Sequence, residues 1–252
     1  MKMKKGVILL FFLCLFSCDT KDAPETPEEP VCTCEELQRE LPWDYPVKPG
    51  TDEWRAFKTS QEMVDVCQIP DEVLTSLSTE DLTDICLNYP LWMDVFRFNY
   101  KDDGLNKFFS DFNGIRELYE RKEAAGELLK RYDKQLCWLD WNKGEFSTTY
   151  SVAFLERLFT RLHLQSEEDK EILKKILQSL VAGYEIQRNI YDEDYAYHFY
   201  MIEFQDNFYS RAHIIHKMGK LTPELHYLVC CPSRANAEMV KLLDELSYQL
   251  IK

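Results

Sequence analysis

The residues best suited to chemistry lie in one short stretch near the middle of the chain. Trp138, Asp140 and Trp141 fall within four positions, and Glu145 follows them, close to Tyr150. An indole ring can stack on the flat face of a sugar, while carboxylates hydrogen-bond its hydroxyls or catalyse cleavage of a glycosidic bond. The stretch therefore predicts a patch that binds or processes a glycan. The alternative interpretation is a tryptophan pair in the core, at the end of a helix.

Two cysteines that end similar stretches are the next candidates. TSQEMVDVC ends at Cys67, and STEDLTDIC ends at Cys86. Each stretch begins with a hydroxyl residue followed three positions later by an acid, the capping-box pattern that starts a helix. The i, i+3, i+4 spacing then places each cysteine on the apolar stripe of a short helix. We therefore expect two buried thiols and a repeated helical unit, not a metal or redox pair.

The histidines form no metal-binding motif. His198, His213 and His216 fall on a helix predicted from Glu193 to Met218, which would separate His198 from His216 by about 27 Å. His213 and His216 could share a metal only with an acid from elsewhere, and no H-E-x-x-H pattern occurs. The chain also lacks a G-x-S-x-G, P-loop or dinucleotide-binding glycine pattern. We therefore expect no metal, no cofactor and no catalytic residue.

The N-terminus predicts export and lipidation. Lys2, Lys4 and Lys5 precede an apolar run over residues 7–16. The run is too short to span a bilayer, which needs about 20 apolar residues, and it has the layout of an export signal. It ends in Leu-Phe-Ser-Cys, which resembles the lipobox of bacterial lipoproteins. The resemblance implies cleavage before Cys18, a lipid such as palmitate on that cysteine, and attachment to the membrane. An ordinary signal peptide with an incidental cysteine is the alternative.

A flexible acidic tether is predicted to follow Cys18. Residues 19–30 contain three prolines and five acids and almost no apolar side chain, so they cannot bury enough surface to offset the entropy of ordering. An acidic run here resembles the surface-export signal of Bacteroidetes lipoproteins, whereas Asp19 resembles an inner-membrane retention signal of enterobacteria. We expect a cell-envelope protein, at the outer membrane. The net charge of -14 becomes still more negative without the signal lysines, which argues against nucleic acid as a partner.

The cysteines after the tether give no recognisable framework. Cys32 and Cys34 lack the C-x-x-C spacing of a zinc or thioredoxin-like site, and so do Cys230 and Cys231. Export into an oxidising compartment permits disulfides, but their connectivity does not follow from the sequence. One pairing to test joins the region of Cys32 and Cys34 to the Cys230-Cys231 turn.

Apolar periodicity predicts helices over most of the body. The clearest runs from Glu167 to Gln187 behind the N-cap candidate Ser166, with apolar residues at i, i+3 and i+4. The same spacing predicts single helices over residues 113–132 and 152–162, and a last one over 239–250 behind Ser233. Thr222 and Pro223 are typical of a helix start. Residues 144–150 include the β-branched Thr148 and Thr149 and predict a short strand or an extended loop.

Together these patterns predict an all-α, irregular multi-helix fold. Short helix pairs, hairpin-like or solenoid-like, are expected in the N-terminal third, and longer packed helices after it. We expect three segments: a signal peptide over residues 1–17, a lipidated cysteine and tether over 18–42, and a single helical domain over 43–252.

One further resemblance rests on turn and apolar positions between about residues 43 and 120. The stretches Tyr45-Pro46, Pro49-Gly50-Thr51, Cys67-Gln68-Ile69-Pro70 and Tyr89-Pro90 are similar to uncharacterised lipoproteins of Bacteroidetes. The resemblance implies a helical fold and no particular activity. The favoured expectation is a non-enzymatic, lipid-anchored domain that binds or scaffolds another envelope component, either a protein or a glycan. The alternative is a glycan-binding or glycan-processing lipoprotein that uses residues 138–150.

Overall fold

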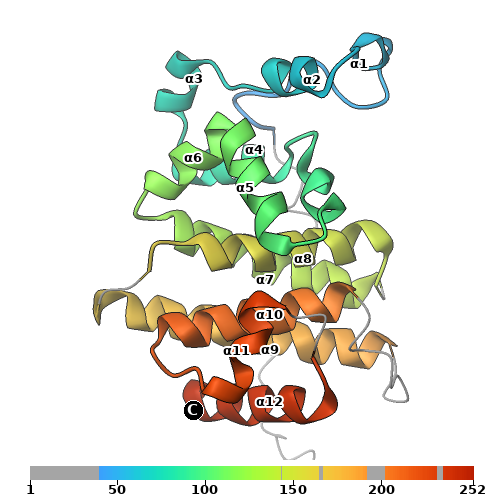
Figure 1. Ribbon diagram of the computed structural model, residues 1–252. Coiled ribbons are helices and arrows are strands. Elements are labelled where there is room, and N and C mark those ends of the chain that lie inside the picture. The colour runs from blue at the N-terminus through green and yellow to red at the C-terminus, as the bar shows by residue number, and fades with distance from the viewer. Residues whose placement is uncertain (1–39, 143, 165–166, 192–201, 232–234) are drawn as a thin grey trace, which may run out of the picture. The chain divides into compact units, whose positions relative to one another are not determined.

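Helices account for all the regular structure in the part of the chain that the structure describes. The computed structural model describes residues 40–142, 144–164, 167–191, 202–231 and 235–252, and no strand occurs among them (Figure 1). The predicted all-α fold is confirmed. Its division into short helices first and longer packed helices afterwards is confirmed as well.

The N-terminal part contains short helices, and the rest of the chain contains longer ones. The first group is α1 (Asp52–Ala56), α2 (Ser60–Val66), α3 (Asp71–Ser76), α4 (Thr79–Leu87), the 3-10 helix η2 (Trp92–Arg97), α5 (Lys101–Asp111) and α6 (Asn113–Glu120). The second group is α7 (Ala124–Trp141), α8 (Phe146–Arg161), η3 (Glu167–Asp169), α9 (Lys170–Tyr191), α10 (Ile202–Lys217), η5 (Pro223–Leu225), α11 (His226–Cys230) and α12 (Ala237–Ile251).

Side-chain caps start α2 and α4, as the repeated stretches predict. The Thr59 hydroxyl accepts a hydrogen bond from the Glu62 amide at 3.2 Å, and the Glu62 carboxylate accepts one from the Thr59 amide at 3.1 Å. At α4 the Ser78 hydroxyl accepts from the Asp81 amide at 3.0 Å and donates to the Asp81 carboxylate. These bonds satisfy amides that the first turn of a helix leaves without partners. A break at Lys58 separates α1 from α2.

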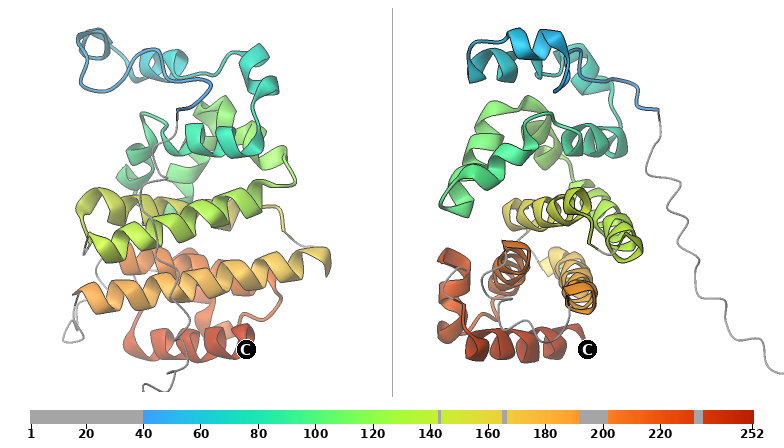
Figure 2. Two further views of the ribbon diagram at one scale, coloured as in Figure 1. Left: turned by 180° about the vertical axis from the view of Figure 1, so that it is seen from behind. Right: turned by 90° about the vertical axis from the view of Figure 1, so that its right-hand side faces the viewer.

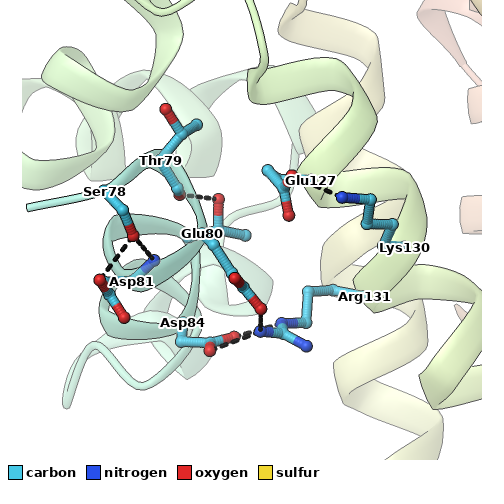
Figure 3. A network of polar contacts seen from close by, with 9 residues as sticks. Ser78, Thr79, Glu80, Asp81, Asp84, Glu127, Lys130 and Arg131 are labelled. Atoms are coloured by element: carbon cyan, nitrogen blue, oxygen red, sulfur yellow. Dashed lines mark hydrogen bonds and ion pairs between the residues drawn. The ribbon is translucent and has the colours of Figure 1, made fainter.

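A buried arginine fastens α4 to α7. Arg131 donates from Nη2 to Asp84 at 2.6 Å and from Nε to the other oxygen of the same carboxylate, while Glu80 lies 3.5 Å from Nη2 (Figure 3). A two-pronged contact of this kind fixes orientation as well as distance. The neighbouring pair of Lys130 and Glu127, 2.7 Å apart, has an exposed lysine and adds little stability.

Aromatic rings and thiols fill the space between the short helices. Tyr89 stacks on Phe112 with ring centroids 4.4 Å apart, and Phe108 lies 5.4 Å from Tyr89. Cys67 and Cys86 are completely buried in the same core. The predicted burial of both cysteines is therefore confirmed, and they act as small apolar side chains.

The long helices pack against one another in pairs. α7 contacts α8 and α9, α10 contacts the same two helices, and α12 contacts α9 and α10 (Figure 2). Their interfaces bury the apolar positions that periodicity predicts, among them Val152, Leu155, Leu158, Phe159, Leu173, Ile176, Leu177 and Leu180. Each helix therefore turns one continuous apolar face toward its neighbours.

The predicted single helix over residues 113–132 is wrong. α6 ends at Glu120 and α7 begins at Ala124, because Arg121 adopts an extended backbone with φ -89° and ψ 133°. From this position the Arg121 side chain donates to the carbonyls of Leu77 at 2.7 Å and Leu74 at 3.1 Å, at the end of α3. The break lets one arginine satisfy helix-terminal carbonyls that α3 would otherwise leave unpaired.

The predicted strand or loop over residues 144–150 is also wrong. Gly144 turns the chain with φ +80°, and α8 begins two residues later at Phe146. Thr148 and Thr149 are buried within the first turn of this helix, so packing overrides their weak helix propensity.

Several predicted helix starts lie outside the described residues. Ser166, Ser233 and the first turns of the helix predicted from Glu193 belong to this group. The described cap of α12 is Asn236, whose side chain accepts from the Met239 amide at 2.9 Å. Each helix in the described ranges is too short or too polar to cross a lipid bilayer.

Candidate functional site

The predicted patch lies at the corner between α7 and α8. Trp138 and Trp141 occupy the last turn of α7, and Glu145 immediately precedes α8. Gly144 reverses the chain between the two helices with a positive φ that other residues rarely adopt. We call this surface the aromatic corner and define it by Trp138, Asp140, Trp141, Glu145, Phe146 and Tyr150.

The outermost indole of the aromatic corner faces solvent. The Trp141 side chain is 67% exposed, and its ring meets the Trp138 ring edge to face with centroids 5.1 Å apart. Trp138 is half-buried, and its indole nitrogen is buried without a hydrogen-bond partner among the described residues. The Trp138 ring thus packs against the Trp141 ring and limits its motion. The alternative of a tryptophan pair in the core is wrong for Trp141.

A second exposed ring begins α8. Phe146 is 67% exposed and lies 4.4 Å from Tyr150, whose ring lies 5.1 Å from Phe96. The Arg157 guanidinium covers Phe96 at 4.2 Å from the ring centre, a cation-π contact. Contacts between rings therefore lead from the exposed Phe146 to the buried guanidinium of Arg157. These contacts hold the Phe146 ring in place.

The two predicted carboxylates flank the exposed indole in sequence and are exposed. Asp140 precedes Trp141 on α7, and Glu145 precedes Phe146. A surface of this composition can stack on a flat ring and accept hydrogen bonds from hydroxyl or amide groups.

A cleft of about 880 Å³ lies elsewhere and was not predicted. Its wall includes Glu40, the first residue that the structure describes, and Tyr45, Trp92, Gln135 and Ser151. Four separate parts of the chain contribute these residues, so no local spacing could identify it. None of the four predicted patch residues lines it.

Glu156 is the most chemically unusual acid in the described part of the chain. The Tyr132 hydroxyl at 2.6 Å and the Asn207 amide at 2.8 Å both donate to one of its oxygens. Burial raises the pKa of Glu156 to about 8, although these two donors act in the opposite direction. A raised pKa is common in catalytic acids, but Glu156 is fully buried and lines none of the clefts described for this chain. We assign it a structural role.

Buried ion pairs surround Glu156. Arg157 donates to Asp206 at 3.0 Å and to the Val95 carbonyl at 3.1 Å. Arg211 donates to Asp244 at 2.7 Å. Sequence reasoning missed all of these residues, because charged side chains in a helical pattern are ordinarily assigned to the solvent face.

The thiols are poor candidates for chemistry. Burial raises the pKa of Cys67 to about 11 and that of Cys86 well above its ordinary value, so neither forms a thiolate readily. Cys137 is disulfide-bonded. Cys230 and Cys231 are in the thiol form, so the structure does not contain the pairing that joins their turn to the region of Cys32 and Cys34.

The described histidines do not assemble a metal site. The His213 ring nitrogen lies 3.0 Å from the Tyr209 carbonyl, and burial lowers the pKa of His213. His216 and His226 approach with ring centroids 6.4 Å apart. Within the described ranges, no group of three or more histidine, cysteine or acidic side chains is arranged to hold a metal ion. His198 lies outside these ranges.

The predicted lipidation site, Cys18, also lies outside the described residues. The site residues that the structure does describe therefore gather at the aromatic corner, on the ends of α7 and α8. No protein-family model, curated protein or solved structure matches the chain.

Proposed function

We propose that this protein is a lipid-anchored component of a bacterial cell envelope and that its helical domain binds another envelope component through the aromatic corner. The lipobox-like Leu-Phe-Ser-Cys ending at Cys18 and the acidic run behind it support the anchor. The disulfide at Cys137 also supports export, because structural disulfides are typical of proteins outside the cytoplasm.

The observation that carries the binding proposal is the exposure of two large rings at one corner. Trp141 and Phe146 are each 67% exposed, although each would gain free energy from burial. Aromatic side chains dominate the binding energy of many protein interfaces, and both rings here rest on other rings that restrict their motion. Restricting a side chain before binding lowers the entropy cost of the complex.

A glycan is the second candidate for the bound component. The exposed acids Asp140 and Glu145 beside an exposed indole favour it, because sugar faces stack on indoles while sugar hydroxyls donate to carboxylates. In this form the protein binds the glycan without cleaving it.

Site-directed photo-crosslinking tests the aromatic corner. The full-length protein would carry benzoylphenylalanine in place of Trp141, with a matched control in place of Tyr100, a 65% exposed ring before α5. We expect a discrete crosslinked envelope protein from position 141 and none from position 100. The same crosslink should be competed by unlabelled wild-type protein and not by a Trp141→Ala, Phe146→Ala variant.

The second candidate has its own measurement. Soluble peptidoglycan and polysaccharide fragments would be titrated while tryptophan fluorescence is followed, with the Trp141→Ala variant as the comparison. A saturable change that Trp141→Ala abolishes would assign a glycan ligand. If neither the crosslinking nor the titration distinguishes the corner from the control position, the binding proposal is wrong.

The anchor is tested separately through Cys18. Cys18→Ala should abolish labelling by an alkynyl palmitate analogue and move the protein out of the membrane fraction. Labelling that persists in Cys18→Ala, while Cys14→Ala removes it, would contradict the assignment.

A further inference from the structure

A small pocket opens between α2, η2 and α5, in the part of the chain that contains the short helices. Its volume is about 250 Å³, slightly below the range of roughly 300 to 1,000 Å³ found for drug-sized ligands. Apolar side chains dominate its floor, namely Val64, Leu91, Val95 and Phe108, together with the ring of Tyr89. The pocket therefore suits a molecule with a small apolar body.

Tyr89, which lines this pocket, carries a buried hydroxyl group. Tyr89 is 2% exposed, and its hydroxyl has no hydrogen-bond partner among the described residues. The stack on Phe112 fixes the ring. Burial raises the pKa of Tyr89, and the nearby groups Cys67, Asp111 and Asp94 act in the same direction, so the hydroxyl remains a protonated donor. The Tyr89 side chain lines this pocket and also the cleft of about 880 Å³.

An unpartnered hydroxyl is unusual at such a depth. Most buried polar groups in proteins have a partner, because burial without one costs free energy. The surrounding residues offer none: Tyr45, the nearest comparable phenol, donates instead to the Ile85 carbonyl at 2.8 Å. A buried polar group without a partner calls for an explanation, and a bound ligand is one.

The charges at the mouth of the pocket neutralise one another. Arg97 pairs with Asp94 at 3.2 Å, and Lys107 pairs with Asp111. All four residues line the pocket, so the mouth carries no excess charge. An uncharged ligand can pass without breaking either pair, whereas an ion would have to compete with one of them.

We propose that this pocket binds a small uncharged molecule that has an aromatic or branched apolar body and one hydrogen-bond acceptor, which the Tyr89 hydroxyl contacts. The site is separate from the aromatic corner, since none of the corner residues lines it. Its function is independent of the partner proposed above.

Two matched probes test the proposal on the full chain in detergent, with a protein-free detergent sample as blank. Acetophenone has a compact apolar body and a carbonyl acceptor, and ethylbenzene has nearly the same shape without the acceptor. Protein-observed NMR would follow the methyl signals of Val64 and Val95. We expect acetophenone to shift both signals saturably. Tyr89→Phe should weaken acetophenone about fivefold, the typical effect of one lost hydrogen bond, and leave ethylbenzene unchanged.

Stability provides a second readout that separates a ligand site from a structural hydroxyl. Tyr89→Phe removes an unpartnered polar atom, so the melting temperature should stay the same or rise. Tyr227→Phe, at an exposed ring outside the pocket, should change neither binding nor melting. A lower melting temperature for Tyr89→Phe would show a structural partner and overturn the proposal. So would equal affinity for the two probes, or the absence of any saturable shift.

Discussion

The types of side chain that are buried differ between the short helices and the long ones. Between α4 and α6, the buried side chains are mainly rings and thiols, exemplified by Tyr89, Phe112 and Cys86. Between α8 and α10, the interior contains a carboxylic acid and an ion pair, Glu156 and Arg157 with Asp206. The pair of Arg131 and Asp84, whose side chains are 8% and 14% exposed, lies where the short helix α4 meets the long helix α7.

The difference follows from the number of contacts that each helix can make. A helix of two turns buries only a few residues, so its position depends on its caps and on large rings that reach its neighbours. A long helix has a continuous apolar face that can pack in more than one register. We infer that the buried polar groups select one register among the long helices, the role best attested for such groups.

The largest expected effect is the loss of stability when one partner of the buried ion pair between α8 and α10 is replaced. Arg157→Met should cost about 3 to 5 kcal/mol of unfolding free energy, because it removes the cation that pairs with the fully buried Asp206. Arg157→Met combined with Asp206→Leu should recover much of the loss, since two apolar side chains carry no charge to desolvate. Denaturant unfolding of both variants measures this. A single-variant loss below about 1 kcal/mol would contradict the comparison.

The second prediction concerns pH. Because the folded-state pKa of Glu156 is about 8, against an ordinary value of 4.5, the folded chain retains a proton that the unfolded chain releases. The stability contributed by this group is therefore full below pH 4.5 and falls as the pH rises toward 8, by at most about 1.4 kcal/mol per pH unit.

Glu156→Gln should remove that slope. The glutamine oxygen can still accept from Tyr132 and Asn207, the two donors at this position. The variant should gain stability relative to the wild type between pH 5 and 8, as measured by urea unfolding at each pH. A parallel pH profile for the two proteins would show that Glu156 is ionised in the folded state.

The third prediction uses two glycines. Gly183 of α9 lies so close to α7 that an added Cβ would be 2.3 Å from the Tyr132 hydroxyl, which is the donor to Glu156. Gly183→Ala should therefore cost about 2 kcal/mol through overpacking and a displaced hydrogen bond. Gly126→Ala is the matched control, since its Cβ would meet nothing within 4 Å.

Gly126→Ala should stabilise the chain by about 0.5 kcal/mol, because alanine is the better helix former. Opposite signs for the two variants in thermal unfolding would support close contact between α7 and α9 at Tyr132. Equal effects would mean that the two helices are farther apart than the structure places them.

The sequence predicts these two regions unequally. Stripes of apolar residues locate the buried faces of α8, α9 and α12, and capping pairs locate the starts of α2 and α4, because both signals are local. The polar interior escapes prediction, since Glu156 and Asn207 are 51 positions apart. Arg121 escapes for the same reason, because its role as a cap for α3 depends on residues more than 40 positions away.

The sequence suggests the residues of the aromatic corner but does not decide which of its rings are exposed. Two tryptophans near two acids identify the corner, but the same residues fit a buried pair equally well. Only the end of α7 at Trp141 and the turn at Gly144 decide that the second indole is exposed. The reading of residues 144–150 as a strand or loop also concealed the i, i+4 spacing that joins Phe146 to Tyr150.

The smallest expected effect is the loss of stability when the side chain that caps a short helix is removed. Ser78→Ala should cost about 1 kcal/mol, because it removes the acceptor of the Asp81 amide at the start of α4. The loss stays modest since Leu82, Ile85 and Cys86 remain buried and Arg131 still holds Asp84. Ser76→Ala is the matched control: this exposed serine only donates to a carbonyl within α3, so its loss should remain within about 0.5 kcal/mol. If the two variants unfold at the same denaturant concentration, α4 is held by packing alone, and the caps do not distinguish the short helices from the long ones.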